Sequence, residues 1–464
     1  MQLTLNAGGR IAAALSLATA GLLAATGAQA QSSANGKPAG QDTGAINAYD
    51  LPASEPGTMT ADSAILIYKE GDGRVQAIEP MLAVTVNGRD GSSYSARFTY
   101  DTLTGATPNG ASPWTSNQTF VTPVRQRSES HTGASGGTIV TLPGSGLQVL
   151  NYDAAARKLP VDAGFRDQRY ALDLGMTKPL TDATKLSLGI NGSTETDYQS
   201  ISGRAGIAQE LGGNNTTLSF GINFEHDISK PHYGTPPPLT QMNGNLKGPS
   251  RSKNVLGLIA GVTQVVAPGV VVQANYTFGS LNGYQTDPYK IVSVVDSATG
   301  APQRYLYESR PDKRTRHAAY LGTKVAVGSF VTELSGRYYT DSWGIKAVTA
   351  QVSEHVPVGE KAYIEPMVRY YHQTAANFFT YYLNGSRSLP QYASADSRLD
   401  KFNAITGGIS GGYKLTDKLE LYGLAEYYKQ AKAGAPAQLP GNSQLDLFAG
   451  TNAISLMTGI KLTF

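Results

Sequence analysis

Long stretches of the chain alternate between apolar and polar residues with a period of two. Two of them place apolar side chains at Leu186, Leu188 and Ile190, and at Leu218, Phe220, Ile222 and Phe224. Because successive side chains of a strand point to opposite faces, each stretch predicts a strand with one apolar and one polar face. Beyond residue 30 no apolar run reaches eighteen residues, so the pattern predicts no helical membrane anchor there.

The connections between these strands alternate between short turns and long loops. Short turns lie at Asn87-Gly88, Pro179 to Ala183, Gly212 to Asn215, Ala267 to Gly269, Gly328-Ser329, Pro357 to Glu360 and Thr416-Asp417. Longer loops are Thr104 to Gly164, Ser229 to Ser250, Tyr284 to Lys313, Ala375 to Asp400 and Ala431 to Gly450. Bacterial outer-membrane barrels have this arrangement, with short periplasmic turns opposite long outer loops.

The last residues form an alternating strand from Met457 to Phe464. Such a strand closes a membrane barrel, in which no edge stays unpaired, and we expect its end on the periplasmic side. Counting hairpins backwards gives about fifteen strands to Gly73, and Ile65 to Glu70 supplies one more, since these barrels have even strand numbers. We therefore predict an all-β fold: a single transmembrane antiparallel β-barrel of about 16 strands.

Both ends of the chain carry export signals. Arg10, the apolar run from Ile11 to Ala25 and Ala28-Gln29-Ala30 have the layout of a secretory signal peptide, with an N-terminal membrane helix as the alternative. Gly459, Leu462 and Phe464 resemble the signal that barrel-assembly machinery reads, although Met457 departs from the polar residue usual at its start. We expect residues 1–30 to be a signal peptide for the Sec pathway, 31–60 a flexible periplasmic lead, and 61–464 a barrel in the bacterial outer membrane.

Composition and charge narrow the function. The chain has 464 residues, of which 16% are charged, a net charge of +3 and no cysteine. So small a net charge gives no indication of nucleic-acid binding, and the lack of cysteine excludes disulfides, thiolate metal sites and c-type haem. No phosphate loop or dinucleotide fingerprint is present, so no enzyme is predicted. The expected partner is outer-membrane lipid.

Ten charged residues share the polar face of the predicted strands. They are Glu79, Arg97, Lys185, Glu225, Glu333, Arg337, Glu365, Arg369, Glu420 and Glu426. A Lys or Arg facing lipid at the bilayer midplane costs about 2–4 kcal/mol, so we expect these charges in the lumen. A lumen with both signs is either a water-filled channel with a transverse field or an interior closed by salt bridges, and both readings stay open.

The string Asp101-Thr102-Leu103-Thr104-Gly105-Ala106-Thr107 stands where a strand meets the longest loop. It resembles the acceptor motif D-x-x-[ST]-G-A-T of proteins modified by a periplasmic FAD:protein FMN transferase. The resemblance implies covalent FMN on Thr107, recognition through Asp101, Thr104, Gly105 and Ala106, and redox partners. An ordinary turn is the alternative, because Pro108-Asn109-Gly110 continues it. The strand count puts Thr107 at the outer rim, so modification would precede insertion.

A wider set of strings spans nearly the whole mature chain. It includes Ile65-Leu66-Ile67-Tyr68-Lys69-Glu70, Phe165-Arg166-Asp167, Asp287-Pro288-Tyr289-Lys290, Arg310-Pro311-Asp312, Tyr371-His372-Gln373 and Ser394-Ala395-Asp396-Ser397-Arg398-Leu399. Together with the Asp101 string they resemble the bacterial domain of unknown function (DUF) family 3570. That resemblance implies an exported protein with no assigned activity.

Three functions follow as hypotheses. The first is a channel or transport-type barrel for a small solute, with Thr104 to Gly164 folding inward to narrow the lumen. The second is a flavin-bearing barrel that takes part in extracytoplasmic electron transfer. The third is a surface receptor or adhesin that uses the long loops.

Overall fold

The computed structural model describes residues 56–123, 138–141, 148–213, 215–231, 234–242, 248–433 and 443–464. The predicted signal peptide and residues 31–55 of the predicted lead lie outside the described residues. Within the described ranges, helical structure is too short and too polar to provide a membrane-crossing helix.

The main body is a closed antiparallel barrel, as predicted, and the count of sixteen strands in the described residues confirms the expected number. In barrel order the strands are β1 (Met59–Glu70), β2 (Gln76–Asn87), β3 (Ser93–Pro108), β7 (Val161–Thr181), β8 (Thr184–Thr194), β9 (Tyr198–Leu211), β10 (Thr216–Ser229), β11 (Arg251–Ala267), β12 (Val270–Gly283), β15 (Lys313–Val327), β16 (Phe330–Asp341), β17 (Lys346–Val358), β18 (Ala362–Gln373), β20 (Phe402–Thr416), β21 (Leu419–Lys432) and β22 (Asn452–Thr463). β22 pairs with β1, with Leu462 opposite Ala61, and this pairing closes the barrel.

The outer face of the wall carries the apolar half of the alternating pattern. On β10, Phe220 and Phe224 are 50% and 54% exposed, whereas Asn223 and Glu225 between and beside them are buried. Other strands repeat this with exposed Ile, Leu, Val and Tyr side chains. Such an apolar outer band is what a barrel presents to lipid.

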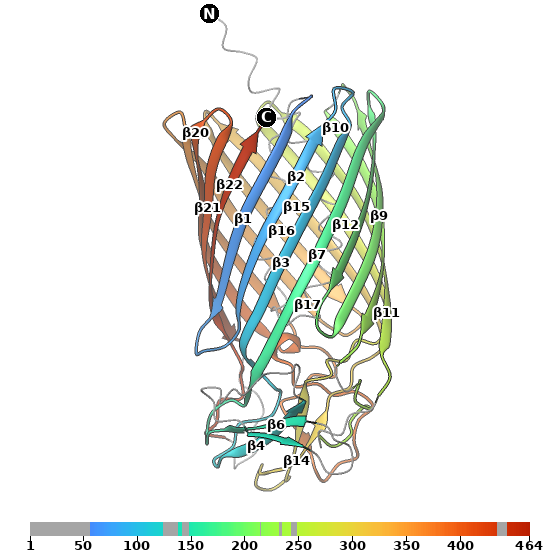
Figure 1. Cartoon of the computed structure of the whole chain (residues 1–464), viewed down its shortest axis with the longest axis vertical. Coiled ribbons are helices and arrows are strands. Elements are labelled where there is room, and N and C mark those ends of the chain that lie inside the picture. The colour runs from blue at the N-terminus through green and yellow to red at the C-terminus, as the bar shows by residue number, and fades with distance from the viewer. Residues whose placement is uncertain are drawn as a thin grey trace, which may run out of the picture.

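Short turns join the strands at one end and longer loops join them at the other (Figure 1). The loops contain two small sheets. One consists of β4 (Gln118–Pro123), β6 (Gln148–Ala154) and β5 (Thr138–Thr141), and the other of β14 (Pro302–Tyr307), β13 (Ile291–Val295) and β19 (Leu383–Asn384). The first long loop is shorter than predicted, because β3 continues to Pro108 and β7 begins at Val161.

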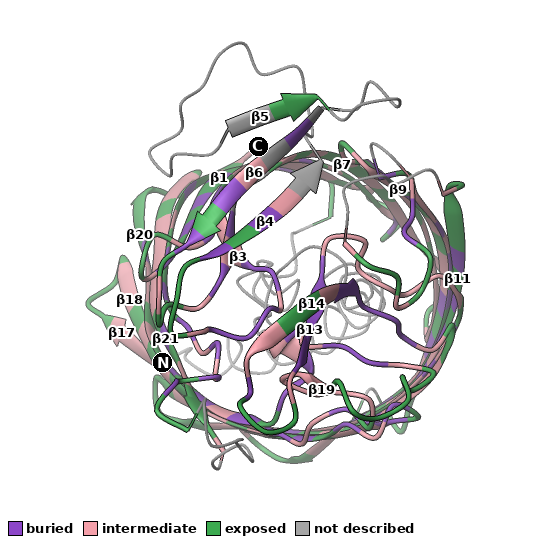
Figure 2. Cartoon of the chain, turned by 90° about the horizontal axis from the view of Figure 1, so that it is seen from below, coloured by how far each residue is buried: buried purple, intermediate pink, exposed green. Residues whose placement is uncertain are grey.

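Three loop segments form a cap over the mouth of the barrel: residues 109–123 with 148–160, residues 284–312, and residues 374–401. Seen from the loop end, β13, β14 and β19 lie inside the outline of the barrel, whereas β5 lies outside it (Figure 2). All five residues of β13 are buried. We expected Thr104 to Gly164 to fold inward and narrow the lumen; the strands over the mouth come from the two later loops.

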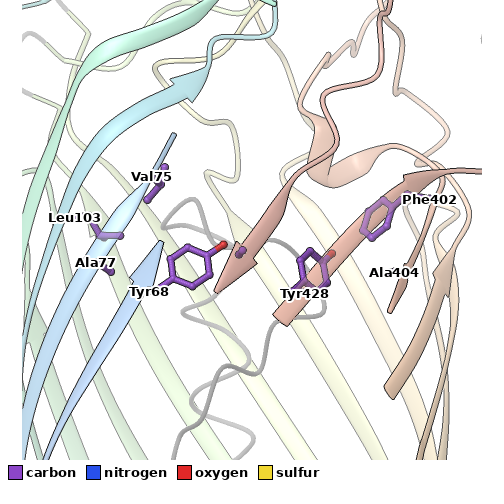
Figure 3. Packing of buried hydrophobic residues seen from close by; sticks show 8 residues of the cluster. Tyr68, Val75, Ala77, Leu103, Phe402, Ala404 and Tyr428 are labelled. Carbon is purple, nitrogen blue, oxygen red and sulfur yellow. The ribbon is translucent and has the colours of Figure 1, made fainter. Parts of the chain in front are cut away.

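Apolar side chains pack within the barrel rim and within the cap. At the loop end of the barrel, Tyr68, Leu103, Phe402 and Tyr428 belong to one buried cluster that spans strands from both ends of the sequence (Figure 3). A second cluster joins Phe120 and Tyr152 of the first loop to Ile291 and Tyr307 of the next. A third cluster joins Ala376 and Leu399 of the cap to Trp343 and Ile345 at the turn between β16 and β17.

Candidate functional site at the mouth of the barrel

Six charged side chains from the cap converge at the mouth. We call Asp287, Lys290, Glu308, Arg310, Asp396 and Arg398 the mouth cluster. The β13–β14 hairpin brings the first four together, because Ile291 pairs with Tyr307 and the Glu308 N–H donates to the Lys290 carbonyl at 3.0 Å. Asp396 caps the short 3-10 helix η1 (Ser397–Leu399), which also carries Arg398.

The two arginines of the mouth cluster bind three carboxylates. The Arg310 guanidinium lies 2.6 Å from Glu308 Oε1 and 2.7 Å from Asp396 Oδ2. Arg398 donates through Nε to both oxygens of Asp396, at 2.9 and 2.8 Å, and Nη2 lies 3.0 Å from Asp287 Oδ2. Asp396 therefore joins two cations that come from different loops.

Backbone contacts hold the carboxylates in place. The Asp287 N–H donates to Glu308 Oε1 at 2.8 Å, and the Ser394 hydroxyl donates to Glu308 Oε2. Reciprocal bonds between Ser309 and Ala393, at 2.9 and 3.0 Å, tie the hairpin to the segment that carries η1. The cluster is thus fixed by main chain as well as by charge.

Burial and pairing shift the pKa values of the mouth cluster in opposite directions. Burial raises the pKa of Asp396, but Arg398 and Arg310 outweigh it and hold that pKa well below 3.8. Burial raises the pKa of Glu308 above 4.5 despite Arg310 beside it. Burial lowers the pKa of Lys290 below 10.5, although Asp396 and Asp287 oppose that shift.

The predicted FMN-acceptor motif lies within β3 and ends beside the mouth cluster. Asp101 pairs with Arg169 of β7 at 2.7 Å on the inner face of the wall, while Thr104 is exposed. At Gly105, φ is +120° and an added Cβ would overlap the Arg74 carbonyl; the strand then bulges past Ala106. Lys290 Nζ donates to Thr107 Oγ1 at 3.2 Å and to the Pro108 carbonyl. The acceptor hydroxyl is therefore engaged rather than presented on a loop.

The ten charges expected in the lumen lie on the face of their strands opposite the exposed apolar residues. They are Glu79, Arg97, Lys185, Glu225, Glu333, Arg337, Glu365, Arg369, Glu420 and Glu426. Among the pairs across neighbouring strands are Lys185 with Glu210 at 2.9 Å, Glu333 with Lys324 at 3.0 Å, and Glu365 with His355 at 2.8 Å. Arg369 Nε donates to Gln351 Oε1 at 2.8 Å. The structure distributes these charges around the wall instead of gathering them into one cluster.

The three residues of the expected assembly signal lie on and just after the closing strand. Leu462 and Phe464 face outward, and the Phe464 N–H donates to the Met59 carbonyl at 2.8 Å. Gly459 faces inward, where a Cβ would overlap the ring of Tyr422. The Tyr422 hydroxyl crosses this glycine to donate to Asp62 of β1.

Sequence reasoning assigned no role to the residues of the mouth cluster. Three strings that contain its residues stood out only by family resemblance: Asp287 to Lys290, Arg310 to Asp312 and Ser394 to Leu399. These strings have one sequence feature in common: Asp, Arg or Lys in predicted loops that also contain proline and small residues. The structure shows that these segments meet at the mouth of the barrel, and that Glu308 also belongs to the mouth cluster.

The chain resembles solved outer-membrane barrels at very low identity. A bacterial polysaccharide outer membrane secretin matches with a TM-score of 0.44 and 7% identity over 89% of this chain and 100% of that one. The ferric-catecholate import receptor Fiu of E. coli K12 matches at 0.38 and 8%, over 89% and 82%. OccD3 (OpdP) of Pseudomonas aeruginosa matches at 0.38 and 7%, over 88% and 92%. These likenesses concern the barrel fold and carry no argument about function.

A search of curated proteins finds no match. A family model does match, over residues 12–462, which is nearly the whole chain and includes every residue of the mouth cluster. The chain therefore belongs to the family described as "Protein of unknown function (DUF3570)".

Proposed function

We propose that the protein is an outer-membrane channel or transport-type barrel for a small solute. The observation that carries the proposal is the closed sixteen-stranded barrel whose inner wall bears side chains of both charges. A wall of this kind is solvated by water, which a small polar solute can share. The structured cap supports selection at the mouth, because β13 and β19 lie across the path into the lumen (Figure 2).

The proposal includes export and membrane insertion. A Sec signal peptide at residues 1–30 would direct the chain to the periplasm, where barrel-assembly machinery would insert it into outer-membrane lipid. Fractionation of expressing cells tests this: the protein should appear in the outer-membrane fraction with a mass that begins at Gln31. A full-length mass in the inner membrane would contradict it.

Planar-bilayer recording of the purified, folded protein tests conduction. We expect discrete conductance steps, and we expect Arg369→Gln to move the reversal potential toward cation preference, because it removes a positive charge from the inner wall. Lys418→Gln, at an exposed turn between β20 and β21, is the matched control and should leave the reversal potential unchanged. A folded protein that never conducts above the lipid baseline would refute the channel.

A flavin-bearing barrel is the second candidate, and one contact favours it. The Lys290 ammonium beside Thr107 Oγ1 would offset the negative charge of a phosphoester at that hydroxyl. Since the cap covers this position in the folded protein, the transferase would act before folding. Intact mass after co-expression with a periplasmic FMN transferase decides the matter, because an unmodified peptide around Thr107 would exclude the flavin.

A further inference from the structure

A small cavity adjoins the mouth cluster between the cap and the rim of the barrel. It has a volume of about 30 Å³ and is lined by Arg74, Thr107, Lys290, Asp396 and Arg398, among others. A volume of this size has room for about two water-sized groups. The lining brings three cationic side chains to one small space, and one of them comes from the barrel rim rather than the cap.

Lys290 is the unusual member of this lining. Its side chain is buried, at 7% exposure, and its ammonium donates only to neutral oxygens of Thr107 and Pro108 in the described part of the chain. An ammonium has three N–H donors, so one remains for the cavity. Burying a charge without a carboxylate at ion-pair distance is costly, and structures rarely keep such an arrangement without a ligand or a functional reason.

Two further residues with donor groups, Arg398 and Thr107, line the same cavity. Arg398 Nη1 is buried and has no hydrogen-bond partner among the described residues, although the other nitrogens of that guanidinium bind Asp396 and Asp287. Thr107 Oγ1 accepts from Lys290, which leaves its own proton to donate. The residues that carry an ammonium, a guanidinium and a hydroxyl thus line one small cavity.

The carboxylates at the cavity are already engaged. Asp396 binds Arg398 and Arg310, and Glu70 lies 3.2 Å from Arg74 Nε. With Arg74 and Arg398 set against Glu70 and Asp396, the lining retains the charge of Lys290. Asp396 and Asp287 oppose the charge of Lys290 from beyond 4 Å, and water in the cavity would bring no counter-ion closer.

We propose that this cavity binds the carboxylate of a small organic acid. One carboxylate oxygen would accept from Lys290 and Thr107, and the other from Arg398 Nη1. A second cavity of about 20 Å³ shares the lining residues Pro108 and Ser397 and offers apolar walls from Leu159, Phe379 and Leu447. The pair of cavities fits an acid with a short aliphatic tail.

The proposed carboxylate site is argued from the cavity and its lining residues alone. That the site selects the transported solute rests on the proposed channel function. Conduction and binding are therefore measured separately. Propionate binding without conduction would support the site and refute the channel. Conduction without propionate binding would support the channel and refute the site.

Calorimetric titration of the full-length protein in detergent with sodium propionate tests the proposal, with sodium bromide and sodium phosphate titrated at equal ionic strength. We expect saturable propionate binding at one site. Lys290→Met should weaken it by at least about tenfold, the loss typical of one charge-assisted hydrogen bond. Lys432→Met is the matched control, because that exposed lysine pairs with Asp446 at the surface, and it should bind as the wild type does.

Thr107→Val provides a second variant that leaves every ion pair of the mouth cluster in place, and we expect it to weaken propionate binding by about threefold to tenfold. Equal propionate affinity in the wild type and Lys290→Met would overturn the proposal, as would an absence of saturable binding in the wild type. Saturable binding of bromide or phosphate with none of propionate would overturn the carboxylate assignment.

Discussion

Asp396 holds the cap together, and its replacement gives the sharpest test of the mouth cluster. Asp396→Asn keeps the size of the side chain and the oxygen that caps η1 through the Arg398 N–H at 3.1 Å. The substitution removes the negative charge between Arg310 and Arg398 and turns one acceptor oxygen into an NH2 donor. Both arginines would then stay buried with one carboxylate fewer.

The expected magnitude follows from burial. Asp396 is 3% exposed, so solvent screens its ion pairs very little. Removing one partner of such a buried pair costs about 3–5 kcal/mol. If this cost falls on cap opening, the open population rises by about a hundredfold to a few thousandfold. The barrel wall should be unaffected, because its strands do not depend on this contact.

Native-state hydrogen exchange measures the effect. We expect the amides of β13 to exchange faster in Asp396→Asn by that factor, while the amides of β10 and β11 exchange at the wild-type rate. Asp446→Asn is the control, since its partner Lys432 is exposed and such a pair contributes about 0–1 kcal/mol. Exchange of β13 within about threefold of wild type in Asp396→Asn would refute the role assigned to the mouth cluster.

Three other predictions concern single residues. The pKa of Lys290 in the folded protein lies below 10.5, so its contribution to cap stability is present above pH 10.5 and is lost as pH falls through the folded pKa. Lys290→Met should therefore slow the hydrogen exchange of β13 amides at pH 7 in anion-free buffer. Faster exchange in this variant would contradict the argument. By the same shift, propionate affinity should begin to fall with rising pH before 10.5, as calorimetry at several pH values would report. Gly459→Ala should lower the free energy of unfolding in urea by about 1–3 kcal/mol, because the added Cβ would overlap Tyr422. Gly407→Ala is the control and should leave this free energy unchanged, because its Cβ would meet no atom within 4 Å. Equal effects of the two substitutions would refute the steric argument.

The barrel was predictable because its signal is local. On β10 the alternation of Phe220 and Phe224 with polar residues defines both faces of the strand without knowledge of its neighbours. Loop lengths then orient the hairpins. The segment from Thr104 to Pro108 was misjudged as loop because it consists of small residues without clear alternation, and its strand character comes from pairing with Asp162 and Val161 across a bulge.

The mouth cluster could not be predicted in the same way. Asp287, Arg310 and Asp396 are separated by long stretches of sequence, and no periodicity links them. Their meeting depends on the β13–β14 hairpin folding over the mouth and on the parallel pairing of β13 with β19. Parallel pairing of two residues from different loops leaves no pattern in either segment. Family resemblance marked the residues without giving their arrangement.

In the proposed channel, the charges of the wall and the charge of Lys290 should have different effects on a solute. Wall charges such as Lys185 face a partner on the adjacent strand, and a close pair acts on a passing solute as a dipole, whose field falls off faster than that of a single charge. Lys290 has no carboxylate within 4 Å among the described residues and lies buried in the cap in low-dielectric surroundings, where one charge acts more strongly. We therefore expect substitutions in the wall to change mainly the ion current, and substitutions around Lys290 to change which solute is accepted.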